Sequence, residues 1–235
     1  MKLAEMNVIS LDQPLSSYYP ELFADGDPRI KQITARQVLS HSSGLPEWRS
    51  GNPIQFHYDP GTGFEYSGEG YYLLQTVISH LKGKMFDQPC EVFEADTKFC
   101  ATDIADYMKQ NVLLPNGMTN STYEIDYPTA KNVATPHDQQ SKPYTKGPFN
   151  APALARYASA GGLLTNAKEY SKFLIDIFRP KENDPFLLNA ASVKKMLEPQ
   201  SSFRKGRRST DVSNGHWVGE LKISPPENRG RLRDD

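Results

Sequence analysis

Three serines in the chain are each followed by a lysine three residues later. A serine hydroxyl becomes a nucleophile when a neighbouring base removes its proton, and on a helix this spacing places the two side chains on one side, one turn apart. The pairs are Ser79/Lys82, Ser192/Lys195 and Ser202/Lys205. Each pair falls at the end of an expected helix or in the C-terminal tail, and none begins a helix after a buried strand. We therefore expect them to be chance matches rather than catalytic groups.

Tyr66 has a position that favours chemistry, because it lies between a glycine-rich turn, Pro60–Gly63, and the start of an expected helix. The positive end of a helix dipole favours a nearby phenolate. A free tyrosine titrates near ~10, so a tyrosine general base needs this help and a nearby cation. The local features alone favour the alternative, in which Tyr66 is a packed aromatic ring with its hydroxyl hydrogen-bonded.

Nothing in the sequence indicates a metal or a cofactor. The five histidines form no His-Glu-x-x-His or comparable pair; they are His41, His57, His80, His137 and His216. The chain also lacks a Walker-type phosphate loop and a Gly-x-Gly-x-x-Gly motif after a strand. Cys90 and Cys100 fit no common zinc spacing, and both a disulfide and two free thiols remain open.

The elements expected to hold these residues are mostly helices and loops. A short helix lies over 33–41 with Thr34 as its N-cap, and Ser67 caps a longer helix over about 69–82. The longer helix has a buried stripe at helical spacing, made by Leu74, Val77, Ile78 and Leu81.

Three further helices are expected in the second half of the chain. They follow Thr102, begin at a cap at Thr165 or Asn166, and span about 190–197. The middle one has an expected buried face of Tyr170, Phe173, Leu174 and Ile177.

Composition narrows the classes of protein. The 235 residues are 37% hydrophobic, with a formal net charge of -1. This balance argues against a nucleic-acid binder, and no apolar run is long enough to span a membrane. Met1–Met6 lacks the apolar block of a signal peptide, which leaves the compartment open. The last 35 residues hold 6 of the 11 arginines and show no clear periodicity, so 201–235 is expected to be a disordered tail.

Five segments, in order along the chain, together resemble the serine β-lactamase-related hydrolases, a family of class C β-lactamases, D-Ala-D-Ala carboxypeptidases and esterases. Residues 33–46 are similar to the family pattern I-T-x-R-x-L-L-x-H-T-S-G-L-P, and 60–71 to P-G-x-x-F-x-Y-S-N-x-G-Y. Residues 11–15, 116–121 and 159–163 resemble L-D-D-P-V, L-G-M-x-x-T and S-A-G-G-L. The resemblance covers roughly residues 1–200.

The resemblance implies acyl transfer, in which a serine attacks an ester, peptide or β-lactam carbonyl and water then cleaves the acyl-enzyme. It makes Tyr66 the general base and places Ser67 and Gly68 in the substrate-binding part of the site. Many members have Asn where this chain has Gly68, which favours a peptidase-like or esterase-like branch over a true β-lactamase. The substrate is then a small molecule or a peptide, and the oligomeric state is left open.

Two parts of the family pattern are missing from the sequence. The catalytic Ser-x-x-Lys is expected before Met1, and the K-T-G or H-x-G strand is expected after the last helix, where 201–235 does not match it. We therefore expect an α+β, penicillin-binding-protein-like fold that is truncated at both ends and forms a partial domain over 1–200. The helical part is expected to be retained and the sheet to be incomplete, which would leave an apolar face exposed. Its expected function is that of a serine-hydrolase fragment, inactive alone. The alternative is a non-catalytic relative that binds a peptide or a partner.

The tail itself suggests how the family pattern ends. The codons for Asn214–Lys222 can also be read in a shifted frame that starts at the third base of the Asn codon. In that frame they permit Trp, then a small residue or Pro, then Leu-Gly-Trp-Gly-Ile-Glu. This shifted sequence resembles a family motif that occurs at this place. We hypothesise that the chain leaves the ancestral reading frame between Gln200 and Asn214, and a divergent tail is the alternative. The nucleotide sequence decides between them.

Overall fold

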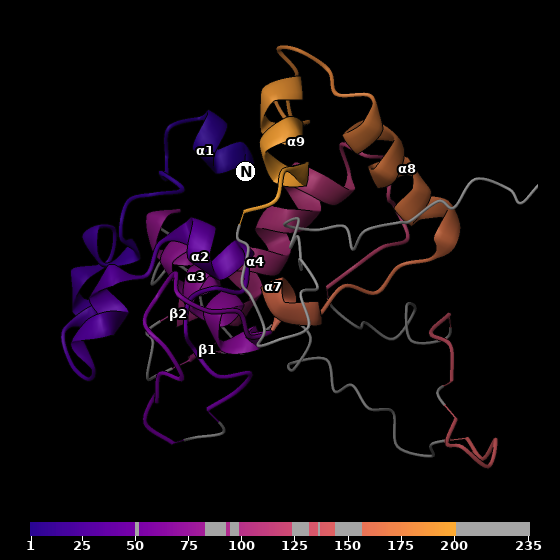
Figure 1. The fold of residues 1–235 in the computed structure, drawn as a ribbon. Coiled ribbons are helices and arrows are strands. Elements are labelled where there is room, and N and C mark those ends of the chain that lie inside the picture. The colour runs from indigo at the N-terminus through magenta and orange to yellow at the C-terminus, as the bar shows by residue number, and fades with distance from the viewer. Residues whose placement is uncertain are drawn as a thin grey trace, which may run out of the picture.

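The computed structural model describes residues 1–49, 52–82, 93–94, 99–123, 132–135, 137–143 and 157–200 (Figure 1). The helices are α1 (Lys2–Glu5), α2 (Ala35–Leu39), α3 (Gly68–Leu81), α4 (Ala101–Met108), α7 (Ala158–Gly161), α8 (Ala167–Phe178) and α9 (Ala190–Leu197). A π-helical turn, Lys109–Leu113, continues α4, and 3-10 turns span Leu15–Ser17, Pro20–Phe23 and Pro28–Gln32. Any pairing of Cys90 with Cys100, and the tail 201–235, lie outside the described residues.

Within the described residues, the strands are β1 (Phe93–Glu94) and β2 (Phe99–Cys100), which pair antiparallel. The described chain is therefore rich in helix, and strand pairing contributes little to it.

Helix α3 is the central element, packed against α2, α4 and α7 (Figure 1). The sequence predicts one buried stripe, but α3 is buried on nearly every face. Two of its buried polar side chains are hydrogen-bonded: the Thr76 hydroxyl donates to the Tyr72 carbonyl, and the Gln75 side chain accepts from the Ser159 amide. Because α3 is held on all sides, its N-terminus is a rigid place for a functional group.

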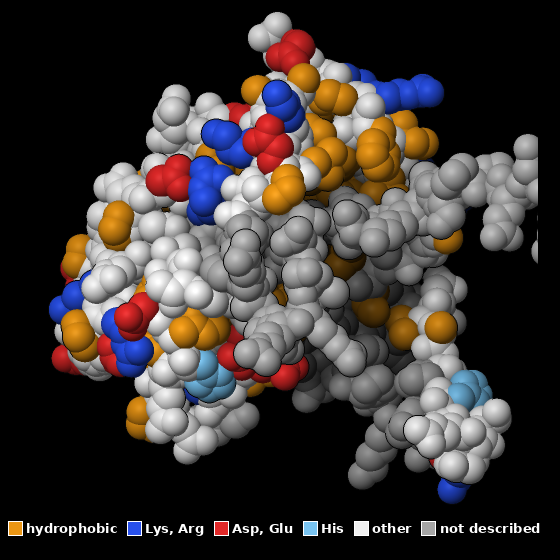
Figure 2. Space-filling model, in the orientation of Figure 1, with side chains coloured by type: hydrophobic (Ala, Val, Ile, Leu, Met, Phe, Trp, Pro, Cys, Tyr) orange, Lys and Arg blue, Asp and Glu red, His pale blue; other side chains and the backbone are white. Residues whose placement is uncertain are grey.

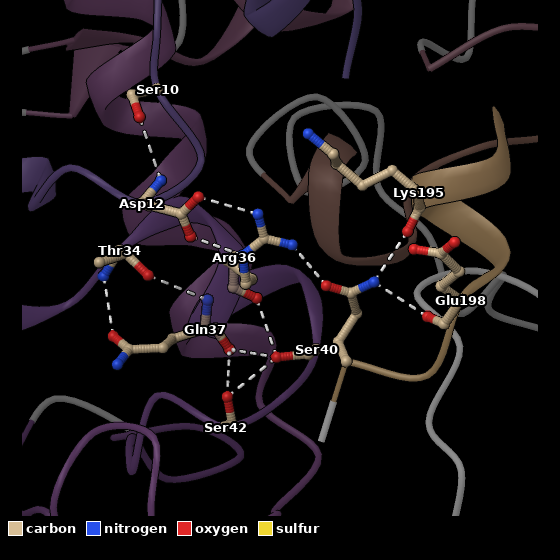
Figure 3. Close-up of polar contacts among 10 residues, drawn as sticks. Ser10, Asp12, Thr34, Arg36, Gln37, Ser40, Ser42, Lys195 and Glu198 are labelled. Atoms are coloured by element: carbon tan, nitrogen blue, oxygen red, sulfur yellow. Dashed lines mark hydrogen bonds and ion pairs between the residues drawn. The ribbon is translucent and has the colours of Figure 1, made fainter. Parts of the chain in front are cut away.

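Helix α2 is fastened by a polar network (Figure 3). Thr34 and Gln37 form the reciprocal capping box, which confirms Thr34 as the N-cap. Arg36 pairs with Asp12 at 2.6 Å and also donates to the Gln200 side chain, beyond the end of α9. The network thus ties the N-terminal segment, α2 and residue 200 together, and it places the turn that follows α2.

Of the two caps that the sequence allows, Thr165 and Asn166, the N-cap of α8 is Asn166, whose side chain accepts from the Glu169 amide. The prediction that Tyr170 is buried is wrong, because Tyr170 is 41% exposed. Glu169 is buried instead, accepting hydrogen bonds from Asn120 and from the Ser121 hydroxyl at 2.6 Å. These donors, which lie far away in the sequence, rotate the helix so that a carboxylate faces inward.

An apolar cavity of about 500 Å³ lies where three groups of core residues meet. The first group comes from residues 1–81 and lines the cavity with Leu39 and Tyr71. The second comes from α4 and its neighbours and includes Ile104, and the third joins α8 to α9 through Ile177. A domain of this size usually has one contiguous core. Here the cavity lies between the three core groups, and an apolar segment that filled it would join them into one core.

Apolar side chains also gather on the surface near α8 and α9 (Figure 2). Ile175 and Phe178 of α8 are exposed, as is Phe186 in the loop that precedes α9. Contiguous exposed apolar surface is uncommon on a complete monomer. It therefore marks a face of the molecule on which further protein can pack.

Candidate functional site

Tyr66 lies in the short segment that leads into α3, and its side chain is 55% exposed. Its ring stacks on the His41 ring, with centroids 4.6 Å apart and planes 29° from parallel. The segment is anchored just before Tyr66, where the Glu65 amide donates to the His41 carbonyl at 3.0 Å. One face of the phenol is thus supported while the side chain keeps its access to solvent.

Ser67 is the N-cap of α3, as the sequence predicts. Its hydroxyl is buried, and the residue is only 1% exposed. The hydroxyl accepts from the Gly70 amide at 3.0 Å and donates to the Pro46 carbonyl at 2.7 Å. The hydroxyl thus acts both as a donor and as an acceptor, and its two hydrogen bonds hold the loop at residue 46 against the start of α3.

Gly68 is the first residue of α3, and it packs directly under the indole of Trp48. A Cβ at this position would lie 2.2 Å from the Trp48 ring, closer than any side chain tolerates. Trp48 also meets the Tyr157 ring edge-on, with centroids 5.0 Å apart. The indole thus occupies the space into which a larger side chain would extend from position 68.

The loop that carries Trp48 is held by a buried carboxylate. Arg49 bonds to Glu69 through its Nε at 3.1 Å and through its backbone amide at 3.3 Å. The Glu69 amide donates in turn to the Glu47 carbonyl at 3.0 Å. No sequence pattern indicates this pair, since Arg49 and Glu69 are twenty residues apart.

His41 lies under the site and was not singled out from the sequence. Its Nδ1 accepts a hydrogen bond from the Ser67 amide at 3.1 Å. Burial lowers the pKa of His41, which favours the neutral ring that this acceptor role requires. The sequence does contain one indication of its importance, because His41 is part of the 33–46 motif.

A family model described as Beta-lactamase matches residues 1–216. The chain belongs to the beta-lactamase family. The match passes residue 200 and ends inside the segment 201–235. It agrees with the resemblance seen in the sequence motifs, and the motif that contains Tyr66, Ser67 and Gly68 lies well inside it.

Solved structures of beta-lactamase-family proteins have the same fold. A class C beta-lactamase is 18% identical, with a TM-score of 0.62, over 90% of this chain and 54% of its own. The D-alanine carboxypeptidase AmpC from Burkholderia cenocepacia is 19% identical, with a TM-score of 0.62, over 87% of this chain and 52% of its own. This chain therefore spans about half the length of these structures.

A curated relative is also similar over part of the chain. The probable fimbrial assembly protein FimD, serogroup H1, from Dichelobacter nodosus is 27% identical over 117 residues. That match covers 42% of this chain and 29% of the relative. The alignment therefore spans less than a third of that protein.

In this beta-lactamase-family chain, the described Ser-x-x-Lys pairs lie in structural positions. Ser79 is near the far end of α3, about 18 Å along the helix axis from the Ser67 cap at 1.5 Å per residue. Its side chain is buried. Ser192 lies on α9, where its backbone amide donates to the Asn189 cap at 2.8 Å. The pair Ser202/Lys205 lies outside the described residues.

Among the described residues, no group of three or more His, Cys, Asp or Glu side chains could hold a metal ion. His57 does pair with Glu65, through Nδ1 and Oε2 at 2.6 Å, on the exposed side of the glycine-rich turn. No described helix is long and apolar enough to cross a membrane.

Proposed function

We propose that this chain carries the tyrosine part of the active site of a serine hydrolase that works through an acyl-enzyme. Tyr66 is the general base, and Ser67 and Gly68 form the adjoining wall of the substrate site. The observation that carries the proposal is the placement of Tyr66. Its side chain reaches solvent, its ring is supported by His41, and it precedes the central, buried helix α3. Preorganised groups of this kind are what proton transfer requires.

The proposed reaction is balanced in protons. The Tyr66 oxygen accepts the proton of the attacking serine hydroxyl as its Oγ bonds to the carbonyl carbon. The proton then passes to the leaving alcohol or amine, whose bond to that carbon breaks. In the second step water attacks the carbonyl carbon of the acyl-enzyme and gives a proton to Tyr66. The bond from that carbon to the serine Oγ then breaks, Tyr66 returns the proton to Oγ, and the acid is released.

The nucleophilic serine is proposed to lie outside residues 1–235, on a helix that fills the apolar cavity. Tyr71 supports this placement because it lines the cavity and also lies 5.1 Å from the His41 ring, centroid to centroid. A helix in the cavity would therefore end beside the ring cluster that contains Tyr66. The cavity walls are mostly apolar, which suits the buried face of such a helix.

The same proposal extends to the sheet. Apart from the β1–β2 pair, the described residues supply no strands, and the chain spans about half of its structural neighbours. The exposed apolar side chains near α8 and α9 fit a face that further protein covers. We therefore propose a fragment with the helical part retained and the sheet incomplete, inactive by itself.

The proposed substrate is an ester or a peptide. The solved neighbours include D-alanine carboxypeptidases and a D-amino acid amidase, which act on small or peptide-like molecules. Many family members have Asn at position 68, and its amide could form hydrogen bonds. In this chain the Trp48 indole packs over Gly68 and presents an aromatic surface there instead. Such a surface favours an apolar group on the substrate.

The test compares two proteins with a fluorophosphonate, which labels activated serines. Residues 1–235 alone should take no label by intact mass. The same chain expressed with its in-frame upstream coding sequence should be labelled at a Ser-x-x-Lys serine and should hydrolyse p-nitrophenyl acetate. Tyr66→Phe in that longer protein should lower the rate by about 100-fold or more, whereas Tyr18→Phe should not.

Two results would overturn this proposal. One is a label on any serine of residues 1–235. The other is the absence of an upstream Ser-x-x-Lys in frame, which would favour a non-catalytic relative that binds a peptide or a partner.

A further inference from the structure

We propose that His41 is a positioning residue, a neutral imidazole that holds the Tyr66 ring by stacking and the Ser67 amide by a hydrogen bond. The inference rests on the proposed role of Tyr66 and deepens it. His41 itself need not touch the substrate. It sets where the phenol lies relative to the start of α3.

The backbone of His41 is held from several sides. Its amide donates to the Val38 carbonyl at 3.0 Å. Its carbonyl accepts from the Glu65 amide at 3.0 Å and from the Tyr58 hydroxyl at 3.3 Å. The residue has a φ of +55°, in the left-handed region that few non-glycine residues adopt. Such a conformation persists where surrounding contacts over-determine it, and it is often associated with functional sites.

The ring of His41 makes one directional hydrogen bond and several aromatic contacts. Nδ1 accepts from the Ser67 amide, so in the neutral ring the proton lies on Nε2. The Tyr66 ring stacks on it at 4.6 Å, and the Tyr71 ring meets it at 5.1 Å and 35°. Phe64 approaches edge-on at 6.1 Å. The imidazole thus joins the turn after α2 to two successive residues at the start of α3.

The protonation state of His41 decides whether this arrangement holds. A proton on Nδ1 would replace the acceptor by a donor, facing the Ser67 amide that is also a donor. The groups that face the ring are the phenols of Tyr66 and Tyr71, with the Tyr58 hydroxyl on the His41 carbonyl. The carboxylate of Glu65, whose amide donates to the His41 carbonyl, is paired with another histidine, His57.

The direction of the pH effect follows from burial. Burial lowers the pKa of His41 from its ordinary 6.5, and it raises the pKa of Tyr71, so that phenol stays neutral beside it. A histidine with a lowered folded pKa takes up a proton more readily in the unfolded chain. Its support for Tyr66 is therefore complete above pH 6.5 and is lost as the pH falls through the folded pKa.

The test uses NMR of the full chain, with ¹³C-labelled tyrosine and histidine rings and ¹⁵N-labelled amides. In the wild type, the Tyr66 ring signal and the Ser67 amide signal should both shift with the midpoint of His41, below pH 6.5. Two variants separate the contacts. His41→Phe keeps the stack but loses the acceptor, and His41→Asn keeps a side-chain acceptor but loses the stack.

The variants have distinct expected results. In His41→Phe, the Ser67 amide should exchange with solvent about 10-fold faster, the equivalent of ~1.4 kcal/mol, while Tyr66 keeps its ring-current shift. In His41→Asn, the Ser67 amide should stay protected and the Tyr66 ring-current shift should disappear. His137→Asn is the matched control, because this histidine is exposed in a remote loop, and it should change neither signal.

The proposal is overturned if Tyr66 and Ser67 do not follow the His41 titration in the wild type. That result is decisive even if a variant fails to fold, because it needs no variant. None of these signals depends on turnover. A failed fluorophosphonate test with intact co-titration would therefore refute the catalytic proposal for Tyr66 while leaving the positioning by His41 in place.

Discussion

Removing the Ser67 hydroxyl tests whether the start of α3 is anchored as the structure indicates. In Ser67→Ala, the Gly70 amide loses its cap and the Pro46 carbonyl loses its donor. The perturbation is confined to these two bonds, because alanine fits the space of serine at this buried position. Tyr66 immediately precedes the affected residue, so the same change should also loosen the candidate site.

The magnitude follows from the two bonds. Loss of an N-cap hydroxyl costs about 1 kcal/mol, and loss of a hydrogen bond to a partly buried carbonyl costs about 1 kcal/mol more. The free energy of unfolding should therefore fall by about 2 kcal/mol. Asn189→Ala is the matched control, because Asn189 caps α9 through a single bond to the Ser192 amide at 2.8 Å. It should cost about 1 kcal/mol.

The assay is equilibrium unfolding in urea, followed by far-ultraviolet circular dichroism, with all three proteins at one pH. Equal slopes would show that the comparison concerns stability rather than a changed unfolded state. If Ser67→Ala and Asn189→Ala lower the free energy of unfolding equally, the bond from Ser67 to Pro46 contributes nothing, and the anchoring argument is wrong.

Three further predictions concern the turn that follows α2 and the buried carboxylate at the start of α8. Gly44→Ala should destabilise the fold by about 2–4 kcal/mol in the same urea assay, since at φ +79° its Cβ would lie 2.2 Å from the Tyr58 carbonyl oxygen. Glu169→Gln should cost about 2–4 kcal/mol because it removes charge-assisted bonds, whereas the exposed Glu198→Gln should change stability by less than about 0.5 kcal/mol. Although burial raises the pKa of Glu169, the Ser121 hydroxyl and its other donors hold it below 4.5, so its contribution is lost as the pH falls through that lower value. The acid side of the stability profile should therefore be flatter in Glu169→Gln than in the wild type.

Helix caps were the part of the fold that the sequence predicted best. Thr34, Ser67 and Asn166 each accept from an amide three residues later, so both partners lie within one turn of chain. The apolar stripe of α3 was also found, but the extent of its burial was not. Neighbouring helices decide burial, and the sequence of α3 does not contain them.

The prediction of which face of α8 is buried was wrong at Tyr170, because residues distant in the sequence decide that face. The sequence predicted Tyr170 inward because it is apolar, yet the donors that turn Glu169 inward come from residues 49 and 48 positions earlier. A buried carboxylate is stable only when such donors are in place. Hydrophobic periodicity describes only the residues of α8 itself, so it could not reveal donors that lie elsewhere in the chain.

The sequence by itself determined the family and the motif that contains Tyr66, because both are written in short runs of neighbouring residues. Tertiary structure decided what surrounds that tyrosine. His41 reaches Ser67 from 26 positions earlier in the chain, and Trp48 covers Gly68 from the loop between them. These contacts depend on how two separate turns meet at the start of α3, and only packing around that central helix brings them together.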